Sequence, residues 1–213
     1  VSNKEIESNY LGPQYTNNEI LKIIKINKLK YKKINNIENL IAKEIETGKI
    51  IGHFAGSMEF GHRALGNRSI LADPRKKNNK DKVNKLIKFR ENFRPFAPAT
   101  LNEFSNDIFE MPINRKVNFM ERVYLIKKKW RSKIPAVTHI DGSGRIQTVS
   151  KETNKRLYKI IKEFYNLTGV PVVLNTSFNL NGEPVVMTPE DAIRTFYTCG
   201  LDILVLNDYI IYK

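Results

Sequence analysis

Apolar residues recur every three to four positions in several segments of the chain, which is the pattern of amphipathic helices. The first of these begins near Asn17, where Thr16 and Glu19 have the spacing of a capping box. The other predicted helices are residues 36–47, 77–90, 151–166 and 189–198. Gly48 is predicted to end the helix 36–47, and Thr188 to cap the helix 189–198. We therefore expect residues 1–48 to form a helical segment that leads into the core.

Short apolar runs between these segments predict strands. They occupy residues 49–54, 69–71, 121–126, 135–139, 172–174, 201–206 and 209–212, the last two as a hairpin. Residues 96–99 form an apolar extended stretch, and residues 102–118 have no clear period and predict a loop with a short helix. Because strands and helices alternate, we expect one α/β domain over residues 1–213. Its twisted mixed sheet would carry packed helices and a concave basic face.

The composition is that of a globular protein. Hydrophobic residues make up 41% of the 213 residues and charged residues 27%. No apolar run approaches the roughly 18–20 residues of a membrane span, and the residues after Val1 do not resemble a signal peptide. Cys199 is the single cysteine, which excludes a disulfide within the chain and fits a reducing compartment. We therefore expect a cytoplasmic protein.

The net charge of +14 favours an anionic partner, either nucleic acid or a phosphorylated small molecule. The alternative is that lysines such as those at 127–129 are solvent-exposed residues of a Lys-rich protein and bind no partner. No RRM, KH or helix-turn-helix signature is present in the sequence, so a small phosphorylated ligand is favoured over nucleic acid.

Residues 56–75, GSMEFGHRALGNRSILADPR, concentrate cations and glycines in one stretch. Arg63 and Arg68 carry the rigid guanidinium fork that binds carboxylate and phosphate through paired hydrogen bonds. Gly61 and Gly66 allow backbone N–H groups to approach the same anion. The alternative is a polar loop that only connects two elements.

A second cationic group lies at the end of the predicted helix 77–90. Lys88, Arg90 and Arg94 are close enough in sequence to converge on a phosphate chain. The alternative is a structural role, because the C-terminus of any helix favours cations through its dipole.

The third polar group comprises His139, Asp141 and Arg145, around an Asp-Gly-Ser-Gly sequence. The alternative is a hairpin turn with no further role. His139 and Asp141 are too few for a metal site made by the protein alone, and His53 and His62 have no supporting spacing. The sequence therefore predicts no metal site.

The fourth polar group, Asn175, Ser177 and Asn179, follows the predicted strand 172–174. Residues two apart in an extended segment point the same way, so the Ser177 hydroxyl and the Asn179 amide suit phosphate or amide groups of one ligand. Ser177 lacks a nucleophile-elbow sequence, and Cys199 lies in an apolar helix end, so neither is predicted to be a nucleophile.

Five segments in a fixed order resemble one family, the C-terminal domain of NodU-type O-carbamoyltransferases, which include nodulation-factor, cephamycin and tobramycin carbamoyltransferases. The segments are MEFGHRALGNRSILADPR, KFRENFRPFAP, THIDGSGRIQTV, TGVPVVLNTSFNLNGEPVV and TPEDAIRTF. The resemblance covers about residues 10–213 and implies a YrdC-like fold. Lys88-x-Arg90 and Ser177-x-Asn179 resemble the KxR and SxN signatures with which YrdC-like proteins hold ATP.

The resemblance implies that the domain takes carbamoyl phosphate and ATP, with Mg²⁺, and forms a carbamoyl-adenylate for O-carbamoylation of a small-molecule hydroxyl. Transfer in this family needs an N-terminal ASKHA-type domain, which carries a metal and a second nucleotide site. That partner domain is not among these 213 residues. We therefore expect the chain to perform only the activation half of the reaction.

The resemblance also assigns a role to each polar group. The residues implied to hold the ATP phosphates are Lys88, Arg90 and Arg94. Those implied to hold carbamoyl phosphate or the developing carbamate are Arg63, Arg68 and Arg145. Those implied to position the adenylate are Asn175, Ser177 and Asn179, and those implied to orient the carbamoyl amide are His139 and Asp141.

The chain departs from the family pattern QGRMEFGPRALG, since it has Ala55-Gly56-Ser57 and His62, so an arginine and a proline are missing at the edge of the loop. We expect His62 or nearby lysines to substitute for the lost cation. Two alternative functions are a nucleic-acid-binding YrdC-like module and a threonylcarbamoyl-adenylate synthase-like enzyme. The RALGNRSI segment resembles the carbamoyltransferases instead.

Overall fold

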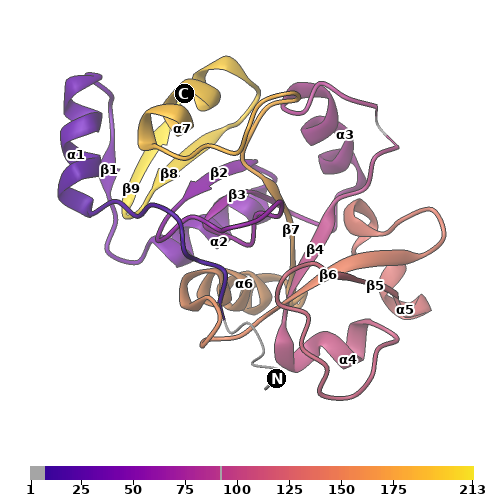
Figure 1. Cartoon of the computed structure of the whole chain (residues 1–213). Helices are drawn as coiled ribbons and strands as arrows, with labels where there is room; N and C mark the ends of the chain where they lie inside the picture. Colours follow the sequence, from indigo (N-terminus) through magenta and orange to yellow (C-terminus); the bar gives the residue numbers. More distant parts are fainter. Residues whose placement is uncertain (1–7, 92) are drawn as a thin grey trace.

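One mixed β-sheet runs through the whole molecule. The computed structural model describes residues 8–91 and 93–213. The strands are β1 (Lys32–Lys33), β2 (Ile51–Phe54), β3 (Arg68–Ala72), β4 (Ala97–Leu101), β5 (Arg122–Leu125), β6 (Ser143–Val149), β7 (Val172–Ser177), β8 (Ile203–Leu206) and β9 (Tyr209–Tyr212). Their order is β1-β9-β8-β2-β3-β7-β4-β6-β5, as Figure 1 shows. The β2–β8 and β4–β6 pairs are parallel and the others antiparallel, so the predicted mixed sheet is confirmed.

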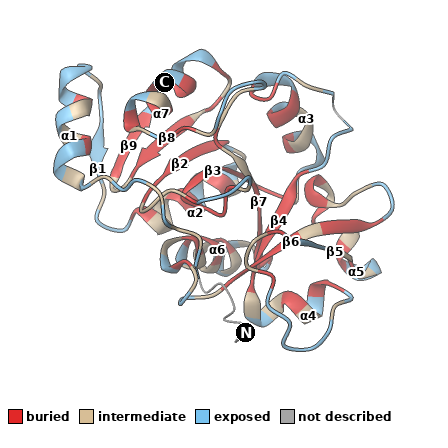
Figure 2. Cartoon of the chain, viewed as in Figure 1, coloured by how far each residue is buried: buried red, intermediate tan, exposed pale blue. Residues whose placement is uncertain are grey.

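Helices pack on this sheet. They are α1 (Asn17–Ile26), α2 (Ile37–Thr47), α3 (Lys77–Leu86), α4 (Ser105–Ile108), α5 (Lys128–Arg131), α6 (Lys155–Thr168) and α7 (Pro189–Thr198), with short 3₁₀ turns η1 (Asn102–Phe104) and η2 (Pro135–Val137). The α2 and α6 helices pack against each other, and α7 contacts β2 and β8 (Figure 1). In Figure 2 the central strands are buried and the outer helix faces exposed, which places the main core between sheet and helices.

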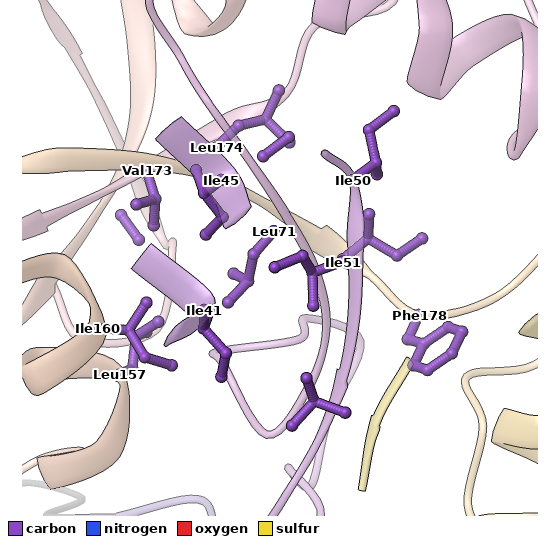
Figure 3. Packing of buried hydrophobic residues seen from close by; sticks show 14 of the residues in the cluster. Ile41, Ile45, Ile50, Ile51, Leu71, Leu157, Ile160, Val173, Leu174 and Phe178 are labelled. Carbon is purple, nitrogen blue, oxygen red and sulfur yellow. The ribbon is translucent and has the colours of Figure 1, made fainter. Parts of the chain in front are cut away.

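The main core is mostly aliphatic. Ile41 and Ile45 of α2 face Leu157 and Ile160 of α6, and all four side chains are fully buried (Figure 3). These side chains pack with Leu71 and the neighbouring strands, so a continuous apolar layer joins both helices to the sheet. Burial of this kind supplies the dominant favourable term in folding.

Local signals for helix ends are confirmed. Thr16 and Thr188 each accept a hydrogen bond from the backbone N–H three residues on, and Glu19 and Asp191 complete both capping boxes. The α2 helix ends at Gly48, which has the left-handed backbone conformation common at helix C-termini.

Around residues 135–149 one predicted strand is wrong and one strand was not predicted. Residues 135–137 form a 3₁₀ turn instead of a strand, since Val137 N–H donates back to the Ile134 carbonyl and Pro135 has no N–H to give a sheet. Residues 143–149, for which no strand was predicted, form β6 between β4 and β5.

The α3 helix ends at Leu86, earlier than the predicted residue 90. Lys88 N–H still bonds to the Val83 carbonyl, and Phe89 then takes a positive φ of 44°, which a continuing helix does not allow. The chain changes direction after α3, and the Lys88 side chain points toward the end of β7, where it bonds to Ser177.

A segment near the N-terminus crosses the Arg-rich loop, and we call residues 9–13 the N-terminal strap. The strap pairs with residues 58–60 through three backbone hydrogen bonds, among them Gly12 N–H to Met58 O at 2.9 Å. Tyr10 adds a bond from its hydroxyl to the Leu65 carbonyl at 3.0 Å. The strap therefore restrains this loop from outside the sheet.

Candidate functional site

A buried carboxylate shapes the loop between β2 and β3. Glu59 Oε1 accepts backbone N–H bonds from Leu65 at 2.6 Å and Asn67 at 2.8 Å. It also accepts from the N–H of Arg68 at 3.3 Å. These bonds curl the loop so that Arg63 and Ala64 face the end of the sheet, where both line a cavity. Glu59 was not predicted to have a role, although an acid directly before the Gly-His-Arg sequence of an Arg-rich stretch was the available signal.

Gly66 is required by the same curl. Its φ is 118°, and a Cβ there would lie 2.7 Å from Leu157 Cδ2 of α6. We expect Gly66→Ala to lower the free energy of unfolding by about 1–3 kcal/mol, measured by urea denaturation. Gly61→Ala is the matched control, because Gly61 has the same φ of 118° and open space around the position of its Cβ. An equal loss in both variants would contradict a contribution from packing against Leu157.

Arg68 does not lie where the sequence predicts. Its side chain is 0% exposed and stacks 3.6 Å above the centre of the Phe54 ring. The guanidinium donates to backbone carbonyls, with Nη2 bonded to Pro13 O at 2.9 Å and Nη1 to Ala55 O at 3.1 Å. Burial lowers the pKa of Arg68 to about 10, so it stays charged at neutral pH. Arg68 therefore holds loop and strap together and does not line the cavity.

Lys88 joins the two predicted nucleotide signatures. Its ammonium donates to Ser177 O at 2.6 Å, Asn179 O at 2.9 Å and Asn179 Oδ1 at 2.6 Å. Ser177 Oγ in turn donates to Asn179 Oδ1 at 2.6 Å. The Lys88 side chain is 4% exposed, and burial together with the Arg90 charge lowers its pKa to about 7. The KxR and SxN segments thus form one hydrogen-bonded cluster.

A polar cavity of about 120 Å³ opens next to this cluster. Arg63, Arg90 and Arg145 line it from three different segments, together with Asn175 and Ser177 of β7. No acidic residue is among those that the described part of the chain contributes to its lining. Burial, and then the like charges of Arg63 and Arg90, lower the pKa of Arg145. Guanidinium groups held together in this way make a strong anion site.

Arg90 is fixed on one side of the cavity. Its Nε donates to Asn84 Oδ1 at 2.7 Å, and its guanidinium lies 4.9 Å from the centre of the Phe96 ring. Burial and the Arg94 charge lower its pKa. Held by these contacts, Arg90 keeps a defined position before any ligand arrives.

Arg94, His139 and Asp141 lie off the cavity lining and outside the Lys88 cluster, whereas Lys88 and Asn179 lie in that cluster and Arg68 is buried under the loop. Arg94 pairs with Glu91 at 3.0 Å, and both side chains are largely exposed. Asp141 accepts a bond from Ser143 N–H at 2.9 Å, and His139 Nδ1 lies 3.0 Å from Ser143 Oγ. Burial is the main cause that lowers the pKa of His139. His139 and Asp141 therefore brace the turn that precedes β6, while Arg145 of the same segment reaches the cavity.

Within residues 8–91 and 93–213, no group of three or more His, Cys, Asp or Glu side chains is placed to hold a metal ion. The helices in this part of the chain are all too short or too polar to cross a membrane.

Comparison with known proteins identifies the family. The family model of the carbamoyltransferase C-terminus matches residues 42–213. The chain belongs to the carbamoyltransferase C-terminal family. This carbamoyltransferase C-terminal domain is also 46% identical to nodulation protein NolNO of Sinorhizobium fredii over 186 residues, which are 87% of this chain and 27% of that protein.

Other relatives agree with this assignment. The domain is 44% identical to nodulation protein NolO of Bradyrhizobium diazoefficiens, over 84% of this chain and 33% of that protein. It is 40% identical to nodulation protein U of Rhizobium tropici, over 67% of this chain and 24% of that protein. The carbamoyltransferase C-terminal domain thus spans about a quarter to a third of the length of these curated relatives.

The fold has a solved counterpart. The domain is similar to full-length HypF, whose crystal structure is a phosphate- and nucleotide-bound form, with a TM-score of 0.54 and 14% identity. The similarity covers 85% of this chain and 22% of HypF. At this identity the likeness concerns the fold, and it confirms the predicted YrdC-like α/β class for the carbamoyltransferase C-terminal domain.

Proposed function

We propose that this domain binds carbamoyl phosphate and ATP and forms a carbamoyl-adenylate, the activated donor for O-carbamoylation of a small-molecule hydroxyl. The observation that carries the proposal is the cavity in which Arg63, Arg90 and Arg145 meet beside Lys88. Four buried or half-buried cations without an acid on the cavity lining need an anion to offset their mutual repulsion. A phosphorylated small molecule supplies that anion.

In the proposed reaction, water first hydrolyses carbamoyl phosphate to carbamate and inorganic phosphate. A carbamate oxygen then bonds to the α-phosphorus of ATP. Pyrophosphate leaves with the electron pair of the broken bond. Lys88 and Arg90 neutralise the phosphates, and Arg63 and Arg145 hold the carbamate oxygens. Chemistry of this kind depends on positioning and charge neutralisation rather than on a covalent nucleophile. Mg²⁺ would enter on the triphosphate and help to neutralise it.

The described side chains support the absence of a nucleophile from this proposal. Ser177 Oγ donates its hydrogen to Asn179 Oδ1, an amide oxygen that does not act as a general base. Cys199 is buried, and burial raises the pKa of its thiol, which disfavours the reactive thiolate.

We also propose that the chain is a single activation domain that works with an N-terminal ASKHA-type domain, which would bind the acceptor. The relatives support this division, since they are about three to four times as long as their match to this chain. A nucleic-acid ligand is less favoured, because the arginines converge on a cavity of about 120 Å³ that suits one small phosphate group better than a polymer.

The test is ATP–pyrophosphate exchange that depends on carbamoyl phosphate, measured with the 213-residue chain and Mg²⁺. We expect Arg145→Ala to reduce this exchange by about 100- to 1000-fold, since it removes a half-buried cation from the reacting groups. Arg115→Ala is the matched control, because it removes the same charge from an exposed position elsewhere. Exchange that is absent in the wild type, or unchanged in Arg145→Ala, would refute the proposal.

A further inference from the structure

A chain of amides fixes the orientation of Asn175 at the cavity. Gln147 Nε2 donates to the Leu65 carbonyl at 2.9 Å, and Asn175 Nδ2 donates to Gln147 Oε1 at 2.8 Å. A backbone carbonyl only accepts hydrogen bonds, so Gln147 must present its NH₂ group to Leu65. Gln147 then presents its oxygen to Asn175, so Asn175 must donate from its own NH₂ group. The amide chain therefore leaves Asn175 Oδ1 on the other side as an acceptor.

This acceptor is left unsatisfied. Asn175 is 1% exposed and lines the cavity, and its Oδ1 has no hydrogen-bond partner among the residues that the structure describes. A buried carbonyl oxygen without a donor is unfavourable, and such groups in folded proteins call for a partner. A ligand that fills the cavity with an N–H group would satisfy it.

The sheet register makes the amide chain possible. Asn175 on β7 lies opposite Ala97 of β4, and Gln147 on β6 lies opposite Ala99 of the same strand. Side chains two residues apart on a strand share a face, so both amides and both alanines project to one side. Because alanine is small, the longer amides reach each other across β4.

The same face carries an unsatisfied donor. Arg145 precedes Gln147 by two residues on β6, and its Nε is a buried atom without a hydrogen-bond partner in the described part of the chain. The cavity lining thus includes one residue with an unsatisfied donor and one with an unsatisfied neutral acceptor. A carbamoyl group has the complementary pair, a carbonyl oxygen and an NH₂ group on one carbon.

We infer that Asn175 Oδ1 accepts a hydrogen bond from the NH₂ group of the carbamoyl substrate, and that Gln147 is a positioning residue that holds Asn175 in this orientation. Together they select a carbamoyl phosphate over an acyl phosphate that carries a methyl group in place of NH₂. This inference rests on the proposed function and names the feature of the substrate that the cavity reads.

The experiment measures dissociation constants of carbamoyl phosphate and acetyl phosphate by isothermal titration calorimetry with the wild-type chain, Asn175→Leu and Gln147→Met. We expect the wild type to prefer carbamoyl phosphate by about 10- to 100-fold, because acetyl phosphate leaves the buried oxygen unpaired. Both variants should reduce this preference to about threefold or less. Inorganic phosphate, which lacks both the NH₂ and the methyl group, should bind all three proteins with similar affinity.

The outcomes separate this inference from the proposed function. A wild type that binds carbamoyl phosphate and acetyl phosphate equally would overturn the inference, even if neither variant folds. Variants that melt like the wild type and retain its preference would overturn it as well. If the wild type binds neither carbamoyl phosphate nor inorganic phosphate, the proposed function itself fails.

Discussion

Lys88→Met is expected to reduce carbamoyl-phosphate-dependent ATP–pyrophosphate exchange by about 100- to 1000-fold, the usual cost of removing one preorganised charge from a reacting site. Methionine nearly preserves the length of the side chain but donates no hydrogen bond. Ser177 and Asn179 would then lose the ammonium that joins them to the end of α3. Exchange assays with wild-type and variant protein at equal concentrations measure the effect.

The pH dependence gives a second readout of the same side chain. Burial and Arg90 lower the pKa of Lys88 to about 7 in the free protein, with Cys199 acting weakly in the opposite direction. Phosphate binding favours the protonated ammonium, so the pKa rises in the complex and a proton is taken up on binding above pH 7. The affinity for ATP should therefore fall by up to about tenfold per pH unit above 7.

In Lys88→Met this part of the pH dependence should disappear, while titration of the ligand itself remains. A variant with the wild-type pH profile, or with normal exchange, would show that Lys88 only supports the turn at Ser177. An unfolded variant is recognised by its circular dichroism spectrum, and Lys88→Arg then offers a charged replacement for the same assay.

Arg68→Ala is expected to lower the free energy of unfolding by about 3–5 kcal/mol, because it leaves several backbone carbonyls buried without donors and a void above a ring. The affected groups include Pro13 O and Ala55 O, and the ring is that of Phe54. Urea denaturation followed by tryptophan fluorescence measures the loss, since Trp130 is the single tryptophan of the chain.

This variant also decides between two roles for Arg68. The sequence predicts an anion-binding residue, whereas the structure gives it a position inside the protein. A variant with wild-type stability but no affinity for phosphate would favour the role predicted from sequence. Arg115→Ala again serves as the control for the loss of one positive charge.

Features set by neighbours in the sequence could be predicted. The helix caps at Thr16 and Thr188 depend on residues within three positions in the sequence, and the structure confirms both. The contact between Lys88 and the Ser177–Asn179 turn joins residues 89 or more positions apart. Periodicity could not reveal that contact, but the KxR and SxN signatures had already suggested it.

Features that depend on distant partners could not be predicted from periodicity. Arg68 is internal because β3 pairs it with Phe54 of β2, and only this register puts the ring against the guanidinium. The β6 strand was missed because Arg145 and Gln147 are polar residues on a face that an ordinary strand fills with apolar ones. Arg145 lines the cavity and Gln147 bonds to Asn175 beside it, so this strand lacks the alternation of apolar and polar residues from which strands are predicted.

The N-terminal strap limits how far the chain can be shortened from its N-terminal side without loss of contacts to the Arg-rich loop. The family match begins at residue 42, yet the strap at residues 9–13 is bonded to the Arg-rich loop from outside that range. A chain shortened to the matched region would lose the Tyr10 hydroxyl from the carbonyl that also anchors Gln147. It would lose the Pro13 carbonyl from Arg68 as well. The region that the family model matches is therefore smaller than the region whose contacts hold the Arg-rich loop in place.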